Sequence, residues 1–199
     1  MSKEQKEYKE YIKEIVSSSI ATKNDLLDSN ECIEMIDMLS KSCLESLQQG
    51  GKIIFAGNGG SFGDAQHISA EFTSRFLFDR SPLASIALGT NSSSMSAIGN
   101  DYGYESVFSR ELDALGKPTD TFVPITTSGN SPNIIEAIKV ANYKNIRTIG
   151  LTGSNNGKIN NICDCISVPS KDTGRIQECH ILIGHIVCGL VERNYFDKS

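Results

Sequence analysis

Apolar residues recur at three- and four-residue intervals through the first fifty residues of the chain. The first series is Tyr8, Ile12, Ile15 and Ser19, and the second is Cys32, Ile36, Leu39, Cys43 and Leu47. This spacing places each series on one face of an amphipathic helix. Gly50 and Gly51 follow, and glycine readily adopts the left-handed conformation that ends a helix. Residues 1–50 are therefore predicted to form an amino-terminal helical hairpin.

Short apolar runs then alternate with longer helical patterns. Strands are predicted at 52–56, 84–88, 121–125, 147–151 and 163–168, and helices at about 61–75, 92–115, 132–143 and 175–195. Such alternation is typical of a parallel sheet with helices on both faces. The predicted fold class is α/β with about five parallel strands. Residues 51–199 form its core, and with the hairpin they make one domain of 1–199.

The charge and apolar content of the chain restrict its partners and location. The formal net charge is −5, and acidic and basic residues are mixed along the sequence, which disfavours nucleic acid and anionic lipid as partners. No segment approaches the roughly 18 apolar residues of a membrane span, and residues 1–20 lack a signal-peptide core. A cytoplasmic protein is expected, with its six cysteines as free thiols. Cys163 and Cys165 share a face of the last strand and are interpreted as small core residues rather than metal ligands.

The first polar loop, from Gly57 to Ser61, opens a helix. Glycine lets backbone amides approach a ligand closely, and a helix N-terminus supplies N–H donors and partial positive charge. Ser61 is predicted to cap this helix, with Asp64 at the capping-box position. A tight turn explains the loop about as well as ligand binding does. A dinucleotide site is disfavoured because Phe62 stands where GxGxxG requires its third glycine.

The second polar loop, residues 126–131, follows the third strand. Ser131 before Pro132 is typical of a helix start. That explanation does not account for the other hydroxyls of the loop, on Thr126, Thr127 and Ser128. Hydroxyls and backbone amides at the carboxyl end of a parallel sheet form an anion site that needs no Lys or Arg, which suits this acidic chain.

All three histidines fall on the two helices that could border these loops. His67 and Glu71 are four residues apart and share a helix face, for which an ion-paired surface is the simpler explanation when the pair is taken alone. Gln177 and His185 are separated by a rise of about 12 Å, so both reach one small ligand only by extending toward it. His180 lies about 140° around the helix from His185, so these two are not expected to line one pocket.

Four segments, in this order and at these separations, resemble the phosphoheptose isomerases, a family of SIS-domain proteins, over nearly the whole chain. They are AGNGGSFGDAQHISAEF, GNDYG, TSGNSPN and GRIQECHILIGHIVCGLVE. The resemblance implies a cytoplasmic homotetramer with one zinc per subunit. It also implies the interconversion of sedoheptulose 7-phosphate and D-glycero-D-manno-heptose 7-phosphate, the first step of bacterial heptose synthesis for lipopolysaccharide or capsule.

Residue roles follow from the resemblance, position by position. The implied zinc ligands are His67, Glu71, Gln177 and His185, and the implied catalytic pair is Glu71 and His185. The implied substrate contacts are Asn58, Gly59, Gly60, Ser61, Glu71, Asn100, Asp101, Thr126, Thr127, Ser128, Ser131 and Gln177. Some members carry Ser in place of Thr126, which retains the hydroxyl. Some carry Asp where this chain has Gly174, so no role for that acid is carried over.

An aldose–ketose isomerase moves a proton between adjacent carbons through an enediol, which requires a base and a group that stabilises the oxyanion. Glu71 is the implied base, and His185 or zinc the stabiliser. A carboxylate held tightly by zinc is a weaker base, so the sequence leaves open whether Glu71 is base, ligand or both. The alternative function is a non-catalytic SIS protein of the type that associates with the replication initiator DnaA. A transcription regulator is disfavoured because residues 1–50 lack a basic helix-turn-helix pattern.

Overall fold

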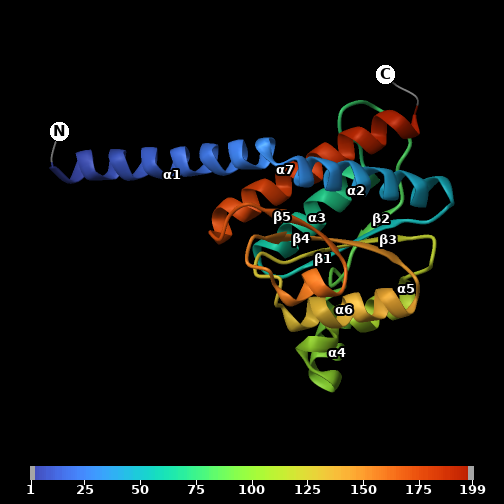
Figure 1. Ribbon diagram of the computed structural model, residues 1–199. Coiled ribbons are helices and arrows are strands. Elements are labelled where there is room, and N and C mark those ends of the chain that lie inside the picture. The colour runs from blue at the N-terminus through green and yellow to red at the C-terminus, as the bar shows by residue number, and fades with distance from the viewer. Residues whose placement is uncertain (1–2, 197–199) are drawn as a thin grey trace.

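The computed structural model describes residues 3–196 of the chain as a parallel sheet between two layers of helices (Figure 1). The strands are β1 (Ile53–Gly57), β2 (Ser85–Ala87), β3 (Thr121–Ile125), β4 (Arg147–Gly153) and β5 (Asp164–Val168). The helices are α1 (Lys3–Asp28), α2 (Asn30–Gln48), α3 (Gly60–Thr73), α4 (Ser92–Tyr102), α5 (Val107–Leu115), α6 (Pro132–Tyr143) and α7 (Thr173–Tyr195). Two short 3₁₀ helices, η1 (Tyr104–Ser106) and η2 (Lys158–Asn161), complete the set within these residues.

The sheet confirms the predicted α/β class. Its strand order is β2-β1-β3-β4-β5, and each neighbouring pair is parallel. Side chains along β1 alternate between two apolar clusters: Ile53 and Phe55 pack beneath α2, α3 and α7, whereas Ile54 and Ala56 pack against α5 and α6. Both faces of the strand are thereby buried, which explains its uninterrupted apolar sequence.

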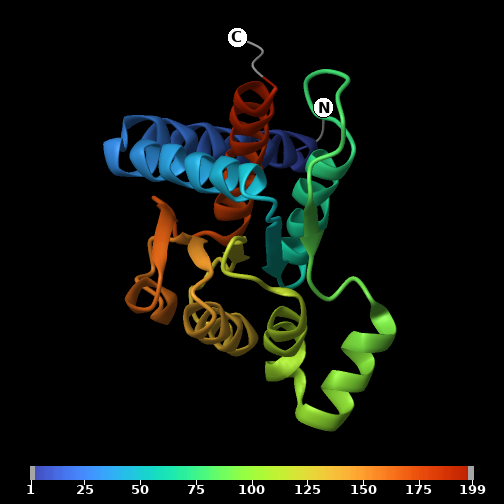
Figure 2. The same ribbon diagram turned by 90° about the vertical axis from the view of Figure 1, so that its right-hand side faces the viewer.

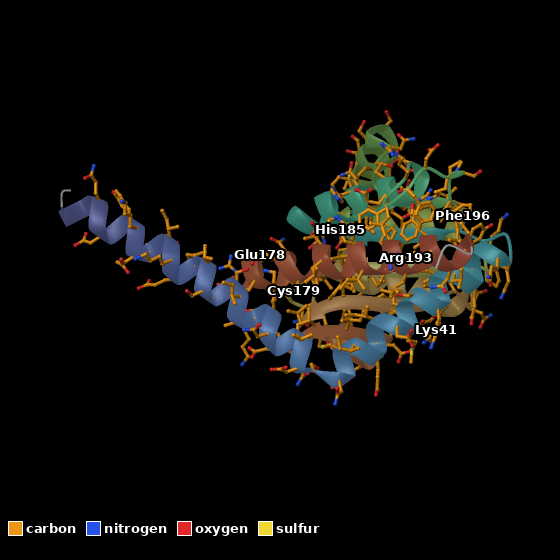
Figure 3. All side chains as sticks on the ribbon, turned by 90° about the horizontal axis from the view of Figure 1, so that it is seen from above. Lys41, Glu178, Cys179, His185, Arg193 and Phe196 are labelled. Atoms are coloured by element: carbon orange, nitrogen blue, oxygen red, sulfur yellow. The ribbon has the colours of Figure 1, made fainter. Side chains whose placement is uncertain are left out.

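The two predicted amino-terminal helices are present and are joined at Ser29, which caps α2 by accepting a hydrogen bond from the Cys32 amide at 3.2 Å. Gly50 has a φ of 74° just beyond α2, as expected of glycine at a helix end. From Ser29 the helices diverge, and the amino-terminal half of α1 extends beyond the sheet (Figures 1 and 3). The carboxyl-terminal half of α1 lies beside α7, where Ser19 donates to Glu178 at 2.6 Å.

The predicted helical stretch at 92–115 is divided into α4, η1 and α5. Gly103 separates the first two with a φ of 86°, which is open to glycine and strained for other residues. The division lets α5 return to the sheet while α4 projects away from it (Figure 2). None of the helices among residues 3–196 combines the length and hydropathy needed to cross a bilayer.

Candidate active site

The two polar loops begin side by side at the carboxyl ends of β1 and β3. These strands are neighbours, and Gly57 at the end of β1 is paired in register with Ile125 at the end of β3. The loops at 57–61 and 126–131 therefore share one edge of the sheet, where ligands of open α/β folds bind.

Helix α3 starts at Gly60, and Gly59 rather than Ser61 occupies the N-cap position. The prediction that Ser61 caps the helix is wrong, because Gly59 turns the backbone one step earlier with φ 57° and ψ −119°. Ser61 is inside the helix and 3% exposed. No side chain caps α3. The first amides of this helix are therefore left to bind an anion from outside the chain.

The second loop is held by its own hydroxyls. Thr126 is buried, and its Oγ1 lies 3.0 Å from Oγ of Ser131. Ser131 occupies the N-cap position of α6 before Pro132, as predicted, but its side chain makes no capping hydrogen bond because it faces Thr126. Thr127 is half-buried and Ser128 is exposed at the tip of the loop. Hydroxyls thus gather at an uncapped helix N-terminus, an arrangement that suits phosphate.

His67, Glu71 and His185 come together where α3 crosses α7. Nε2 of His67 lies 3.0 Å from Nε2 of His185 and 3.2 Å from Oε1 of Glu71. One ligand atom from each residue lies within 4.8 Å of the other two. Figure 3 shows His185 on the side of α7 that faces α3.

The donor set of this cluster fits a transition metal. Around a tetrahedral ion with bonds of about 2.0–2.1 Å, ligand atoms stand roughly 3.4 Å apart, close to the two separations within the cluster. Two imidazole nitrogens and a carboxylate oxygen suit zinc and also other divalent transition metals. The cluster is therefore a candidate metal centre.

Gln177, the fourth residue of the implied ligand set, lies about two turns before His185 on α7, at the glycine loop. A β-carbon added to Gly60 would stand 2.5 Å from Nε2 of Gln177, so the amide packs directly on this glycine. Gly60 lies about 10 Å along α3 from His67. The structure thus places the Gln177 amide at the glycine loop.

Asn100 and Asp101 lie apart from these groups. Their side chains hydrogen-bond to each other at 2.8 Å on the exposed surface of α4. The following segment nevertheless returns to the site, because the Tyr104 hydroxyl donates to Oδ1 of Asn58 at 3.2 Å. Within one chain, the contact between this region and the glycine loop is therefore made by Tyr104 of η1 and not by Asn100 or Asp101.

His180 points away from His185, as the helical spacing predicts. It is 0% exposed, and its Nε2 lies 3.2 Å from the carbonyl oxygen of Thr152. Burial lowers the pKa of His180 to about 4, and the hydrogen bond with Thr152 opposes this shift only in part. The imidazole is neutral at ordinary pH and belongs to the core.

Three residues that support the cluster were not found by sequence reasoning. Phe76 stacks on His185, with ring centroids 5.3 Å apart and planes inclined by 23°. The Glu192 carboxylate accepts from the amides of Phe76 and Leu77 at 3.0 and 2.7 Å. Arg80 donates to Glu192 at 2.8 Å and to the carbonyl oxygen of Glu71 at 2.8 Å. The loop after α3 is thereby fixed against the carboxyl-terminal part of α7.

A signal for Glu192 was present in the sequence. It stands four residues after Cys188, on the apolar stripe of α7 that includes Ile183 and Val187. A charged residue at a core position is expected to have a buried partner. The identity of that partner could not be read from spacing, because Arg80 lies 112 residues earlier in a segment of irregular structure.

Known proteins share this architecture and sequence. Residues 7–153 match the SIS domain family. The chain is 53% identical over 188 residues to a phosphoheptose isomerase of Aneurinibacillus thermoaerophilus, covering 94% of this chain and 95% of the relative. It is 50% identical to phosphoheptose isomerase 2 of Campylobacter jejuni, covering 95% and 94%. The solved structure of phosphoheptose isomerase GmhA from Neisseria gonorrhoeae superposes with a TM-score of 0.87 at 40% identity, covering 93% of this chain and 98% of the other.

Proposed function

Because the chain belongs to the phosphoheptose isomerase family of SIS-domain proteins, we propose that it interconverts sedoheptulose 7-phosphate and D-glycero-D-manno-heptose 7-phosphate. The observation that carries the proposal is the cluster of His67, Glu71 and His185, which α3 connects to the glycine loop. A carboxylate and imidazoles next to a phosphate site are the groups that an aldose–ketose isomerase requires. A heptose precursor for lipopolysaccharide or capsule is the corresponding product.

Phosphate binding is assigned to the loops at the carboxyl ends of β1 and β3. The uncapped start of α3 offers backbone N–H groups, and the loop that leads into α6 carries the hydroxyls of Thr127, Ser128 and Ser131. Asn58, Gly59, Gly60 and Ser61 belong to the first of these loops. Neither loop contains Lys or Arg, so hydrogen bonds and helix dipoles neutralise the phosphate charge.

Proton transfer is assigned to Glu71. Its carboxylate takes the proton from C1 of the ketose and returns it to C2, and the enediol is the intermediate between the two transfers. His185, or a metal bound at the cluster, stabilises the oxygen on which negative charge develops. Phe76 covers one face of the His185 ring and fixes its orientation. Gln177 borders the same space from the glycine loop and orients the sugar hydroxyls.

We further propose that zinc is the ion held by His67, Glu71, Gln177 and His185. The separations of 3.0 and 3.2 Å between donor atoms of the first, second and last of these support a bound metal. When bound, zinc supplies a Lewis acid that polarises the sugar carbonyl. Glu71 would then both hold the ion and face the substrate, and tight binding to zinc would make its carboxylate a weaker base.

We also propose that the chain assembles with three further copies of itself into a homotetramer. Ile12, Val16, Ile20 and Leu27 form an exposed apolar stripe on α1, with exposed fractions from 54% to 70%. Helices with such stripes are expected to pack against another subunit. Light scattering should give the mass of a homotetramer. The six free thiols of the described cysteines accord with a cytoplasmic location.

The isomerase activity is tested by incubating purified protein with sedoheptulose 7-phosphate in deuterated water. NMR should show the aldose phosphate appearing, with deuterium at C2. Fructose 6-phosphate serves as the control substrate, since it shares the phosphate and ketose but is one carbon shorter. Binding of sedoheptulose 7-phosphate without any aldose product or deuterium exchange would sink the proposal and favour a non-catalytic SIS protein.

A further inference from the structure

Two thiols lie side by side at the edge of the sheet, remote from the site described above. Cys163 directly precedes β5 and Cys165 lies within it, and their Sγ atoms are 3.8 Å apart. Asp164 between them turns to the other side and pairs with Arg147 at 2.9 Å. β5 is the edge strand next to β4, and both cysteines pack at the margin of the apolar cluster that includes Ile159.

The surroundings leave the space between the sulfurs open. Gly150 of β4 is paired in register with Cys165. A β-carbon at Gly150 would stand 3.3 Å from Sγ of Cys165 and 3.5 Å from Sγ of Cys163. The absence of a side chain there makes room for both sulfurs. No side chain separates them, and the sulfur of Cys163 also lies 3.6 Å from the carbonyl oxygen of Ile159.

These thiols differ in access from the other cysteines. Cys163 lines an open hollow together with Asn142, Asn160 and Arg147. Both Cys163 and Cys165 are half-buried. The remaining four cysteines, Cys32, Cys43, Cys179 and Cys188, are at most 5% exposed. A reagent in solution therefore reaches the pair in preference to any other thiol.

The two thiols also differ in pKa. Such a difference is typical of a pair in which one thiol attacks the oxidant and the other then closes the disulfide. A hydrogen bond from the Cys165 thiol lowers the pKa of Cys163 below its usual range, against the opposing effect of burial. The same contact, together with burial, raises the pKa of Cys165. Cys163 is thus the better thiolate of the two, and the thiolate is the nucleophile in cysteine chemistry.

We propose that Cys163 and Cys165 form a redox-active pair that a peroxide converts into an intramolecular disulfide. The Cys163 thiolate attacks hydrogen peroxide: an S–O bond forms, the O–O bond breaks, and the departing hydroxide takes up a proton to leave as water. The Cys165 sulfur then gives up its proton and attacks the sulfenic sulfur. An S–S bond forms, the S–O bond breaks, and a second water leaves. In total, two thiols and one peroxide yield one disulfide and two waters.

The backbone at this position permits the bond. The sulfurs have to approach from 3.8 Å to about 2.0 Å. Cys163 lies in a bend just outside the regular strand, so the adjustment falls on a residue that does not belong to β5. The pair sits at the start of β5, whereas the loops of the active site follow the carboxyl ends of β1 and β3. Oxidation is accordingly expected to leave substrate binding unchanged.

Mass spectrometry tests the proposal. The full-length protein is treated with hydrogen peroxide at a few equivalents, blocked with iodoacetamide, unfolded and cleaved with trypsin. Lys158 and Lys171 bound a peptide of residues 159–171 that contains both cysteines and no internal cleavage site. This peptide should lose two hydrogen masses, resist alkylation, and regain two reactive thiols after dithiothreitol. The cysteines outside it should remain reduced and accept alkylation once the protein is unfolded.

Single variants separate the two roles. Cys165→Ser should stop the reaction at a sulfenic acid on Cys163, which dimedone traps. Cys163→Ser should slow oxidation of the peptide at least tenfold, and Cys179→Ser is the matched control that should leave the disulfide unaffected. The proposal is overturned if peroxide leaves both thiols alkylatable, if disulfides link other cysteines instead, or if Cys165→Ser gives no dimedone adduct. Circular dichroism of each variant verifies that the fold is retained.

Discussion

Asn58 and Asn133 exchange two amide hydrogen bonds, each 2.8 Å long, across the ends of β1 and β3. Each side chain donates with its Nδ2 and accepts with its Oδ1, and Oδ1 of Asn58 also accepts from the Tyr104 hydroxyl. Asn133 is 3% exposed, whereas Asn58 lies on the glycine loop that is proposed to bind substrate. The buried Asn133 therefore fixes the half-buried Asn58, and it joins the two loops of the proposed phosphate site.

Asn133→Ala should weaken substrate binding while leaving the chemical step intact. Loss of the two hydrogen bonds is worth about 1–3 kcal/mol, so KM for sedoheptulose 7-phosphate should rise roughly tenfold with kcat nearly unchanged. The control is Asn142→Ala on the same helix, where Nδ2 donates to the Ile162 carbonyl at 2.8 Å, at the other edge of the sheet. Steady-state kinetics in which both variants behave alike would contradict a positioning role.

Glu71→Gln should reduce turnover by roughly 10²-fold or more, because an amide cannot accept the carbon-bound proton. Calorimetry should still detect binding of sedoheptulose 7-phosphate, since glutamine keeps the size and hydrogen-bonding capacity of the side chain. Deuterium should no longer enter C2 of the aldose at an appreciable rate. His180→Asn, on the face of α7 turned away from the cluster, should leave both readouts largely intact. If Glu71→Gln incorporated deuterium at C2 as fast as the wild type, the base would be a residue other than Glu71.

His67→Ala should remove the metal. Elemental analysis of protein purified without chelators or a histidine tag should find about one zinc per wild-type chain and almost none in the variant. Titration of zinc into metal-free protein provides a second readout that is independent of activity. Gln66→Ala is the control, because this exposed neighbour is not among the implied ligands. Equal zinc contents in His67→Ala and the wild type would exclude the proposed centre.

Glu192→Ala should destabilise the fold by about 3–5 kcal/mol, because it leaves the buried Arg80 charge and two backbone amides without their acceptor. The side chains of Arg80 and Glu192 are 2% and 0% exposed. Asp37→Ala provides the contrast: its ion pair with Lys41 has side chains 57% and 68% exposed and should contribute no more than about 1 kcal/mol. Urea unfolding measures both. Similar losses of unfolding free energy in the two variants would show that the buried ion pair stabilises the fold no more than the exposed one.

His180 should make stability fall as the solution is acidified. Its pKa in the fold is about 4, against about 6.5 in a free chain. Between these values the unfolded chain binds a proton that the folded chain excludes, so stability present above pH 6.5 is lost as the pH falls toward 4. The loss amounts to about 3 kcal/mol. His180→Gln can still donate to the Thr152 carbonyl but does not titrate. Urea midpoints from about pH 7 to pH 4.5 should therefore decline less steeply in this variant.

Periodicity in the sequence was sufficient to predict the sheet and its covering helices. All five strands were predicted to within two residues at each end. The central strands β1 and β3 are buried along their whole length and carry largely apolar runs. More than one helix was predicted within the 92–115 stretch, but the place of the division was not. Its cause is a single backbone angle at Gly103, and apolar spacing gives no information about such an angle.

The candidate site was only partly predictable from the residues themselves. Helical spacing correctly separated His180 from His185 and put His67 and Glu71 on one face. Spacing could not bring α3 and α7 together, since their crossing depends on packing between segments more than a hundred residues apart. That packing uses Gly184, where an added β-carbon would lie 2.5 Å from Cδ1 of Ile68. The Arg80–Glu192 pair was missed for the same reason.

The crossing of α3 and α7 has a consequence for the order of events during synthesis. His67 and Glu71 leave the ribosome with the first half of the chain, whereas Gln177 and His185 belong to α7, the last helix described. The same helix supplies Ile176, Ile183 and Val187 to the core beneath α2 and α3. A nascent chain up to residue 172 therefore has an exposed apolar face and half a metal centre. At about 5–20 residues per second, binding of metal and burial of that face are both delayed by seconds and then completed together when α7 docks.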